Sequence, residues 1–175
     1  MVMVRSVVIP KLSIYTTTLH HLMRIHLDVN EIGEAKLIEC EAELKLAKIL
    51  LKSGLLRGAA VKVIQAWRAY LSYIASLNAN LIRINGVRRV SGSIEVDASE
   101  FIIAAMPIKL MMRVSEMLRS VDPELMELTA LALLTYEYWC ANSCSDSTGR
   151  VIDDELAKGI IAKLLSRIER KINSI

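Results

Sequence analysis

The sequence is poor in histidine, cysteine and glutamine, and each shortage argues against a class of protein. Its three histidines, His20, His21 and His26, lie near the N-terminus, and their spacing does not stack the last two on one helix face, so no metal site is predicted there. Three widely spread cysteines do not make the disulfide framework of a small secreted domain. Gln65 is the one glutamine, and such depletion of thermolabile amides is typical of a thermophile protein.

Long apolar runs are also missing. The longest stretch without a charge, residues 69–82, is shorter than the roughly 18 residues of a membrane-spanning helix. Pro10 and Lys11 interrupt the apolar N-terminus, which lacks the cleavage pattern of a signal peptide. We therefore expect a cytoplasmic protein that does not enter a membrane.

Apolar residues nevertheless make up 53% of the chain, with a mean hydropathy of +0.38, whereas roughly 45–50% is usual for soluble domains. Large exposed apolar patches are rare on monomers. The surplus therefore predicts a subunit interface, most simply that of a homodimer.

Apolar residues recur with a helical period from about residue 30 onward, which predicts an all-α fold. Short connections favour an antiparallel up-and-down bundle of about five helices. Capping aspartates and prolines predict helices over about 28–53, 55–77, 98 onward, 122–140 and 153 onward. Pro107 either kinks the third helix or makes it start again. Residues 1–30 form a poorly specified N-terminal extension, and 31–175 are predicted to form a single domain.

The first of these helices carries two apolar stripes, which predict a central helix that packs on two sides. One stripe consists of Ala35, Ile38, Ala42, Leu46 and Ile49, and the other of Leu37, Cys40, Leu44, Ala47 and Leu51.

Strands are indicated in two places only. Asn85-Gly86 between apolar residues is typical of a two-residue hairpin, although that hairpin would set Arg83 opposite Arg88, two like charges. Residues 2–9 have the composition of a strand, whereas Leu19, Leu22, Met23 and His26 suggest a helix. The N-terminal extension therefore stays ambiguous.

A stretch without any acid, residues 44–94, is the main electrostatic feature of the sequence. A helical wheel places several of its basic residues on one arc of the second helix, and an arginine-rich loop follows, an arrangement typical of phosphate binding. The alternative is a solvated or ion-paired face of an ordinary bundle helix. The candidate anion- or nucleic-acid-binding residues are Arg57, Lys62, Arg68, Arg83, Arg88 and Arg89.

Glu137 lies on an apolar helix face, where a carboxylate either pairs with a cation or has a raised pKa. We expect a structural pair, with Arg68 or Arg113 as the cation, rather than a catalytic acid. Cys140 and Cys144 are interpreted as small apolar residues rather than metal ligands. Because the chain has no glycine-rich phosphate loop and no recognisable catalytic motif, no catalytic residue and no cofactor is predicted.

Three segments together resemble the crenarchaeal PaREP family: "LLKSGLLRGAAVKVIQAWRAYLSYIA", "FIIAAMPIKLMMRVSEML" and "LTALALLTYEYWCANSCSD". The matching positions are Gly54, Leu55, Arg57, Ala59, Ala60, Lys62, Gln65, Ala66 and Trp67, then Ile102, Ile103, Ala104, Met106 and Pro107, then Glu137, Tyr138 and Asn142. Where the family has polar residues after its Met-Pro pair, this chain has Ile108 and Lys109.

The resemblance implies a helical bundle akin to the HEPN superfamily, usually dimeric, in which many members are ribonucleases or partners of small nucleotidyltransferases. The ribonuclease motif of that superfamily is an arginine followed four to six residues later by a histidine. No histidine follows His26, so a histidine-dependent HEPN ribonuclease is excluded.

Three hypotheses follow. The leading one is a non-catalytic interaction module that homodimerises through apolar helix faces. The second is an RNA- or nucleotide-binding protein that uses the basic residues of the acid-free stretch, paired with a nucleotidyltransferase. The third and weakest is an enzyme centred on Glu137 and a nearby basic residue.

Overall fold

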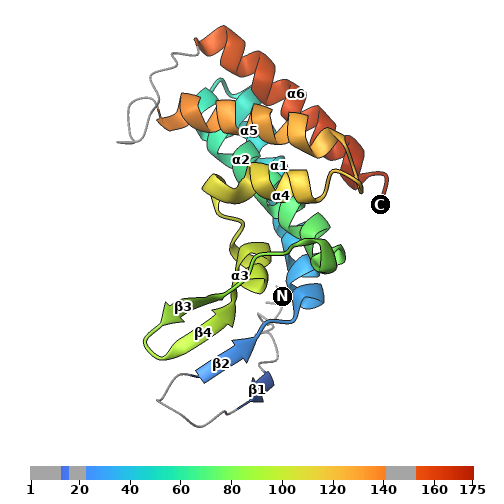
Figure 1. Ribbon diagram of the computed structural model, residues 1–175. Coiled ribbons are helices and arrows are strands. Elements are labelled where there is room, and N and C mark those ends of the chain that lie inside the picture. Colours follow the sequence, from blue (N-terminus) through green and yellow to red (C-terminus); the bar gives the residue numbers. More distant parts are fainter. Residues whose placement is uncertain (1–12, 16–22, 141–152) are drawn as a thin grey trace, which may run out of the picture.

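The computed structural model describes residues 13–15, 23–140 and 153–175, which form a helical body with a small sheet at one end (Figure 1). The α-helices of this part are α1 (Val29–Lys52), α2 (Leu56–Leu77), α3 (Ala98–Ala105), α4 (Met111–Met117), α5 (Glu124–Cys140) and α6 (Asp154–Ile172). The predicted helical bundle is therefore confirmed. None of the described helices has the length and apolar character needed to span a bilayer.

Aspartate side chains fix the starts of the helices, as the capping signals predict. The carboxylate of Asp28 accepts hydrogen bonds from the backbone N–H groups of Asn30 and Glu31 at the start of α1. Asp97, Asp122 and Asp153 do the same at the starts of α3, α5 and α6. At the other end of α1, Gly54 adopts a φ of +74°, the left-handed conformation that glycine tolerates best.

Pro107 restarts the helix rather than kinking it. Helix α3 ends at Ala105, Met106 has a left-handed φ of 38°, and α4 begins at Met111 after a short 3₁₀ turn (Ile108–Leu110). Proline cannot donate to the helical ladder. One predicted helix is therefore two, and the described residues form six α-helices where about five are predicted.

The sheet contains four strands, β1 (Ser13–Tyr15), β2 (Met23–His26), β3 (Val87–Ser91) and β4 (Ile94–Asp97), in the order β1-β2-β4-β3. Strand β2 runs parallel to β4, and the other pairs are antiparallel. The helix suggested through Met23 and His26 is therefore wrong at these residues, which form β2.

The predicted hairpin is also wrong in its position. The turn lies between Ser91 and Ile94, where Gly92 has a φ of +47°, and Asn85-Gly86 only precedes β3. In this register Arg89 faces Glu95, so the repulsion expected between Arg83 and Arg88 does not arise.

Helix α2 is the centre of the core and packs against α1, α3, α4, α5 and α6. Its alanines Ala59, Ala60 and Ala66 are completely buried, which lets neighbouring helices approach closely. The indole N–H of Trp67, also completely buried, donates to the Thr129 hydroxyl on α5 at 3.0 Å. This hydrogen bond therefore joins the first family-like segment, on α2, to the third, on α5.

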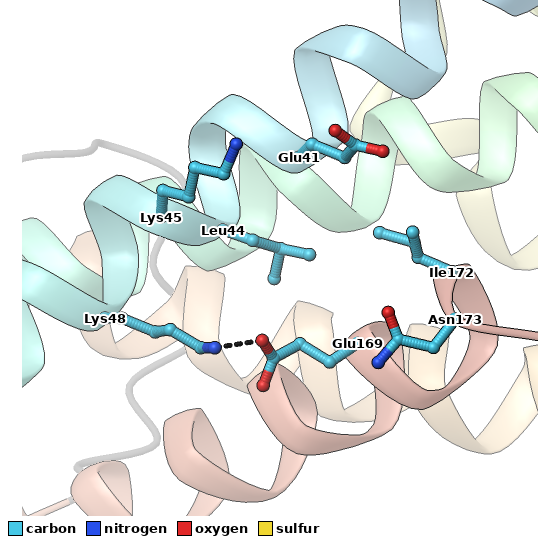
Figure 2. A pocket seen from close by; sticks show the side chains of 7 residues that line it. All are labelled: Glu41, Leu44, Lys45, Lys48, Glu169, Ile172 and Asn173. Carbon is cyan, nitrogen blue, oxygen red and sulfur yellow. Dashed lines mark hydrogen bonds and ion pairs between the residues drawn. The ribbon is translucent and has the colours of Figure 1, made fainter.

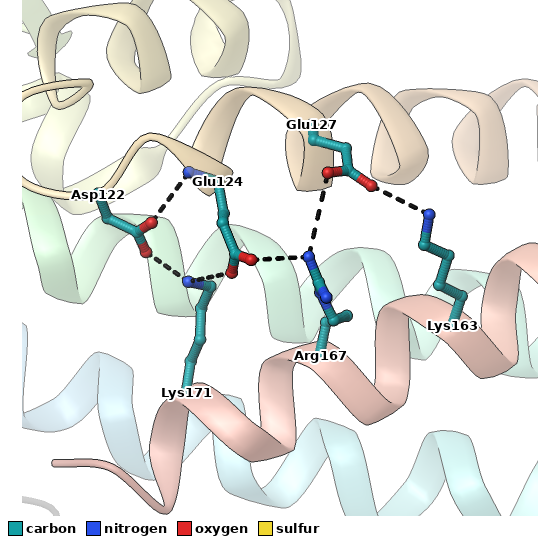
Figure 3. Close-up of polar contacts among 6 residues, drawn as sticks. All are labelled: Asp122, Glu124, Glu127, Lys163, Arg167 and Lys171. Atoms are coloured by element: carbon teal, nitrogen blue, oxygen red, sulfur yellow. Dashed lines mark hydrogen bonds and ion pairs between the residues drawn. The ribbon is translucent and has the colours of Figure 1, made fainter.

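Ion pairs join the start of α5 to the end of α6 (Figure 3). Lys171 contacts the carboxylates of Asp122 and Glu124, with 2.9 Å between its Nζ and Glu124 Oε2, and Arg167 lies 2.7 Å from Glu124 Oε1. Lys163 lies 3.0 Å from Glu127 one turn further along. The acids at the start of α5 therefore face the bases at the end of α6, a pairing that both helix dipoles favour.

Candidate functional site

The clearest candidate surface is an apolar row on α1 that no described residue covers. Its members are Ala35, Ile38, Ala42, Leu46 and Ile49, all exposed, and they fall within about 80° around the helix axis. Ile38 is 70% exposed, Leu46 45% and Ile49 60%. We call these five residues the α1 row.

The opposite stripe of α1 behaves as an ordinary core face. Cys40, Leu44 and Ala47 are buried against α2. The expectation of a central first helix packed on two sides is therefore not met within a single copy of the chain, where α2 takes the central place. One of the two predicted stripes faces solvent.

Charged residues flank the α1 row, and the two flanks differ. On one side, Lys36 lies 2.6 Å from Glu39, and Lys62 of α2 lies 3.0 Å from Glu43. On the other side are Glu34, Glu41, Lys45 and Lys52, within about 40° around the axis. None of these four forms a hydrogen bond or ion pair with any residue that the structure describes.

A pocket of about 280 Å³ lies beside this second flank, between α1 and the end of α6 (Figure 2). Leu44 and Ile172 supply its apolar surface. Lys48 contacts Glu169 across it, whereas Glu41 and Lys45 extend from α1 without contacting each other in the view of Figure 2. With side chains of both signs, the pocket has no electrostatic preference for a charged ligand of one sign.

The α2 members of the predicted basic surface are engaged within the chain. Lys62 pairs with Glu43 and donates to Gln65 Oε1 at 2.9 Å. Arg68 donates to the backbone carbonyls of Met106 at 3.0 Å and Ala105 at 2.8 Å, so its charge meets the negative end of α3. Arg57 lies over the Tyr138 ring, with its guanidinium carbon 5.9 Å from the ring centroid.

The remaining members lie near the sheet, away from those of α2. Arg83 donates to the carbonyl of Asn80 at 3.4 Å, and Arg89 lies 3.7 Å from Glu95. Arg88, on the exposed strand β3, has no hydrogen-bond or ion-pair partner among the described residues. The acid-free stretch thus divides into engaged residues on α2 and exposed arginines at the sheet.

Glu137 does not meet either predicted cation. Arg68 is bound to the end of α3, Arg113 is exposed, and the buried Glu137 Oε2 has no hydrogen-bond partner within the described part of the chain. Arg68 as the anchor of the left-handed turn at Met106 is a role that sequence reasoning missed, because its two acceptors are backbone atoms distant in the sequence.

The cysteines and the possible metal ligands of the described residues do not form a reactive or metal-binding site. Burial, reinforced by Glu41 and Glu39, raises the pKa of Cys40 to about 12, which leaves a protonated thiol at neutral pH. Cys140 is disulfide-bonded rather than simply a small apolar residue. Across residues 23–140 and 153–175, no group of three or more histidine, cysteine or acidic side chains is placed to hold a metal ion.

Some of the predicted residues lie outside the described part of the chain: His20, His21, Asn142, Cys144 and the predicted strand at residues 2–9.

A family model, that of the archaeal PaREP1/PaREP8 family, matches residues 35–148. No curated protein and no solved structure matches the chain. The matched range contains the α1 row and helices α2 to α5.

Proposed function

The chain belongs to the archaeal PaREP1/PaREP8 family, and from the surface described above we propose that it is a non-catalytic interaction module that self-associates through the α1 row. The observation that carries this proposal is the exposure of Ile38, Leu46 and Ile49 in one row on a helix whose other face lies in the core. Full burial of an aliphatic side chain contributes about 1.5–3 kcal/mol.

Light scattering across a micromolar-to-millimolar concentration series tests the proposal. We expect wild-type protein to form a dimer, and Ile38→Asp to weaken it at least tenfold, because each copy would bring a charge into an apolar contact. Leu156→Asp is the matched control: Leu156 is 55% exposed on α6, far from α1 in the sequence. A strictly monomeric wild type, or equal effects of the two variants, would contradict the proposal.

A second candidate function is RNA binding through the arginines beside the sheet. The observation that favours it is that Arg83 and Arg88 are exposed, and neither meets a carboxylate in the described residues. The comparisons name no RNA and no nucleotidyltransferase, so both partners stay predictions, as does the relation to HEPN proteins.

A salt series with single-stranded RNA tests this second candidate. Replacing Arg83 and Arg88 by alanine removes two phosphate contacts, so the slope of log affinity against log salt should fall by about 1.4. Arg113→Ala combined with Arg170→Ala, at two exposed positions elsewhere, changes the net charge equally. Wild-type protein without salt-dependent binding, or equal losses in the two double variants, would reject RNA binding at this site.

A further inference from the structure

The positions of the α1 row are spaced symmetrically about its middle residue. Ala35 and Ile49 each lie seven residues from Ala42, and Ile38 and Leu46 each lie four residues from it. A second α1 helix that runs antiparallel, with a twofold axis at Ala42, therefore brings each residue of the row opposite another residue of the row. Ile49 of the partner subunit comes opposite Ala35, a large side chain against a small one, and Leu46 of the partner subunit comes opposite Ile38.

We infer that the occupant of the α1 row is a second copy of this chain, packed antiparallel with the twofold axis at Ala42. The inference rests on the proposed function, and it adds the direction and the register of the contact. Alanine at the axis permits the close approach of about 8 Å that tightly packed helices adopt.

A hollow in the surface provides room for this contact. A cavity of about 470 Å³ lies along the first half of α1, and its apolar lining includes Ile32, Ala35, Ile38 and Ala104 of α3. In the antiparallel register, Leu46 and Ile49 of the partner subunit come opposite Ile38 and Ala35, at this hollow. The exposed side chains of one copy thus meet the cavity of the other.

The second flank of the α1 row, which consists of Glu34, Glu41, Lys45 and Lys52 and is called the unpaired flank below, favours the antiparallel direction. Its acids, Glu34 and Glu41, lie in the first half of α1, and its bases, Lys45 and Lys52, in the second. Around a twofold axis at Ala42, this flank of one copy lies beside the same flank of the other copy, which runs in the opposite direction. Lys45 of the partner subunit then comes within about 3 Å of Glu41 along the helix axis, and Lys52 of the partner subunit within about 3 Å of Glu34.

A parallel pair is less complementary in charge. In that arrangement the unpaired flank faces the opposite flank of the second helix at the same height. Glu41 would then lie between Glu39 and Glu43 of the partner subunit, and like charges in an interface disfavour the pairing. The antiparallel pair has a single approach of this kind, between the two copies of Glu41. All four charges of this flank gain opposite charges in the antiparallel pair. In the parallel pair Lys52 gains none, and Glu34 and Lys45 meet only Lys36 and Glu43 of the partner subunit, which are already paired within their own chain.

Cysteine cross-linking of the full chain tests direction and register together. Ala42→Cys should give a covalent dimer under mild oxidation, because the two Cα atoms at the axis come within the roughly 7 Å that a disulfide spans. Ile49→Cys should not, because the two copies of residue 49 lie roughly 21 Å apart along the axes. Wild-type protein is the control for the native cysteines, of which Cys40 is buried.

Light scattering of Ala42→Glu and Ala162→Glu completes the test. Both alanines are exposed, on α1 and α6 respectively, and only the first should weaken the dimer, at least tenfold. A dimer that Ala42→Glu weakens but that Ile49→Cys cross-links overturns the antiparallel register and leaves the proposed function standing. A dimer indifferent to Ala42→Glu, or a monomeric wild type, overturns both.

Discussion

The hydroxyl of Thr129 links three helices in the core, so its removal is the most informative single test of the packing. It accepts the indole N–H of Trp67 at 3.0 Å and lies 2.6 Å from the hydroxyl of Ser115. All three residues are completely buried. Thr129→Val keeps the shape of the side chain and removes the one acceptor that Trp67 has within the described residues.

The expected loss is about 1–3 kcal/mol of unfolding free energy, the cost of leaving a buried polar group unpaired. For a chain of this size, each kcal/mol lowers the Tm by about 2–4 °C. Thr129→Ser keeps the hydroxyl and loses only a methyl group, so it serves to separate the hydrogen bond from packing.

Urea unfolding in a double-mutant cycle measures the bond directly. In a Trp67→Phe background no N–H is left to satisfy, so Thr129→Val should cost at least about 1 kcal/mol less than in the wild type. Trp139→Phe is the matched control background, because Trp139 is half-buried on the same helix, more than two turns from Thr129. A coupling with Trp67 below about 0.5 kcal/mol, the range of independent sites, would refute the reasoning.

Three further predictions concern other parts of the core and its edge. Gly33→Ala would place a Cβ 2.1 Å from Ser76 Oγ. It should therefore lower the free energy of unfolding, measured in urea, by about 1–3 kcal/mol, and by less in a Ser76→Gly background. Because burial raises the pKa of Cys40 to about 12, its labelling by a thiol reagent at pH 8 should be as slow as unfolding; rapid labelling of folded protein would contradict the burial. Burial lowers the pKa of Lys171, but hydrogen bonds to two carboxylates outweigh burial and raise the pKa of Lys171 above 10.5. The hydrogen bond from Lys171 lowers the pKa of Glu124 below 4.5. The network therefore stabilises the fold between these values and is lost as pH rises through the folded pKa of Lys171 or falls through that of Glu124, so the Tm difference between wild type and Lys171→Met should shrink at both extremes; a pH-independent difference would argue against the pairing.

The helices could be predicted from the sequence because their signals are local. Asp28 caps N–H groups two and three residues away, and Gly54 ends the same helix. The choice at Pro107 stayed open because a proline only removes a donor. At the restart in the structure, Arg68 of another helix donates to the two carbonyls of the turn, and these contacts join residues far apart in the sequence.

The sheet could not be predicted, because its central pairing joins residues far apart in the sequence. Met23 pairs with Ile94, and Ile25 pairs with Val96. The strands are three to five residues long, and β3 is exposed throughout, so the alternation that reveals a half-buried strand is absent. Asn85-Gly86 carried the strongest turn signal, yet cross-strand pairing of Arg89 with Glu95 favours the later turn.

Only part of the candidate site could be predicted from the sequence, for a related reason. Periodicity identifies an apolar stripe of α1 but says nothing about whether another helix of the same chain or a second chain covers it. The surplus of apolar residues in the sequence indicated an interface, and the structure locates the exposed stripe at Ile38, Leu46 and Ile49.

The basic arc of α2 was predicted as a binding surface, but its residues are engaged within the chain. A helical wheel shows where Lys62 and Arg68 project, but their partners lie on α1 and at the end of α3. A face can therefore be judged available for binding only after the partners supplied by the rest of the chain are known.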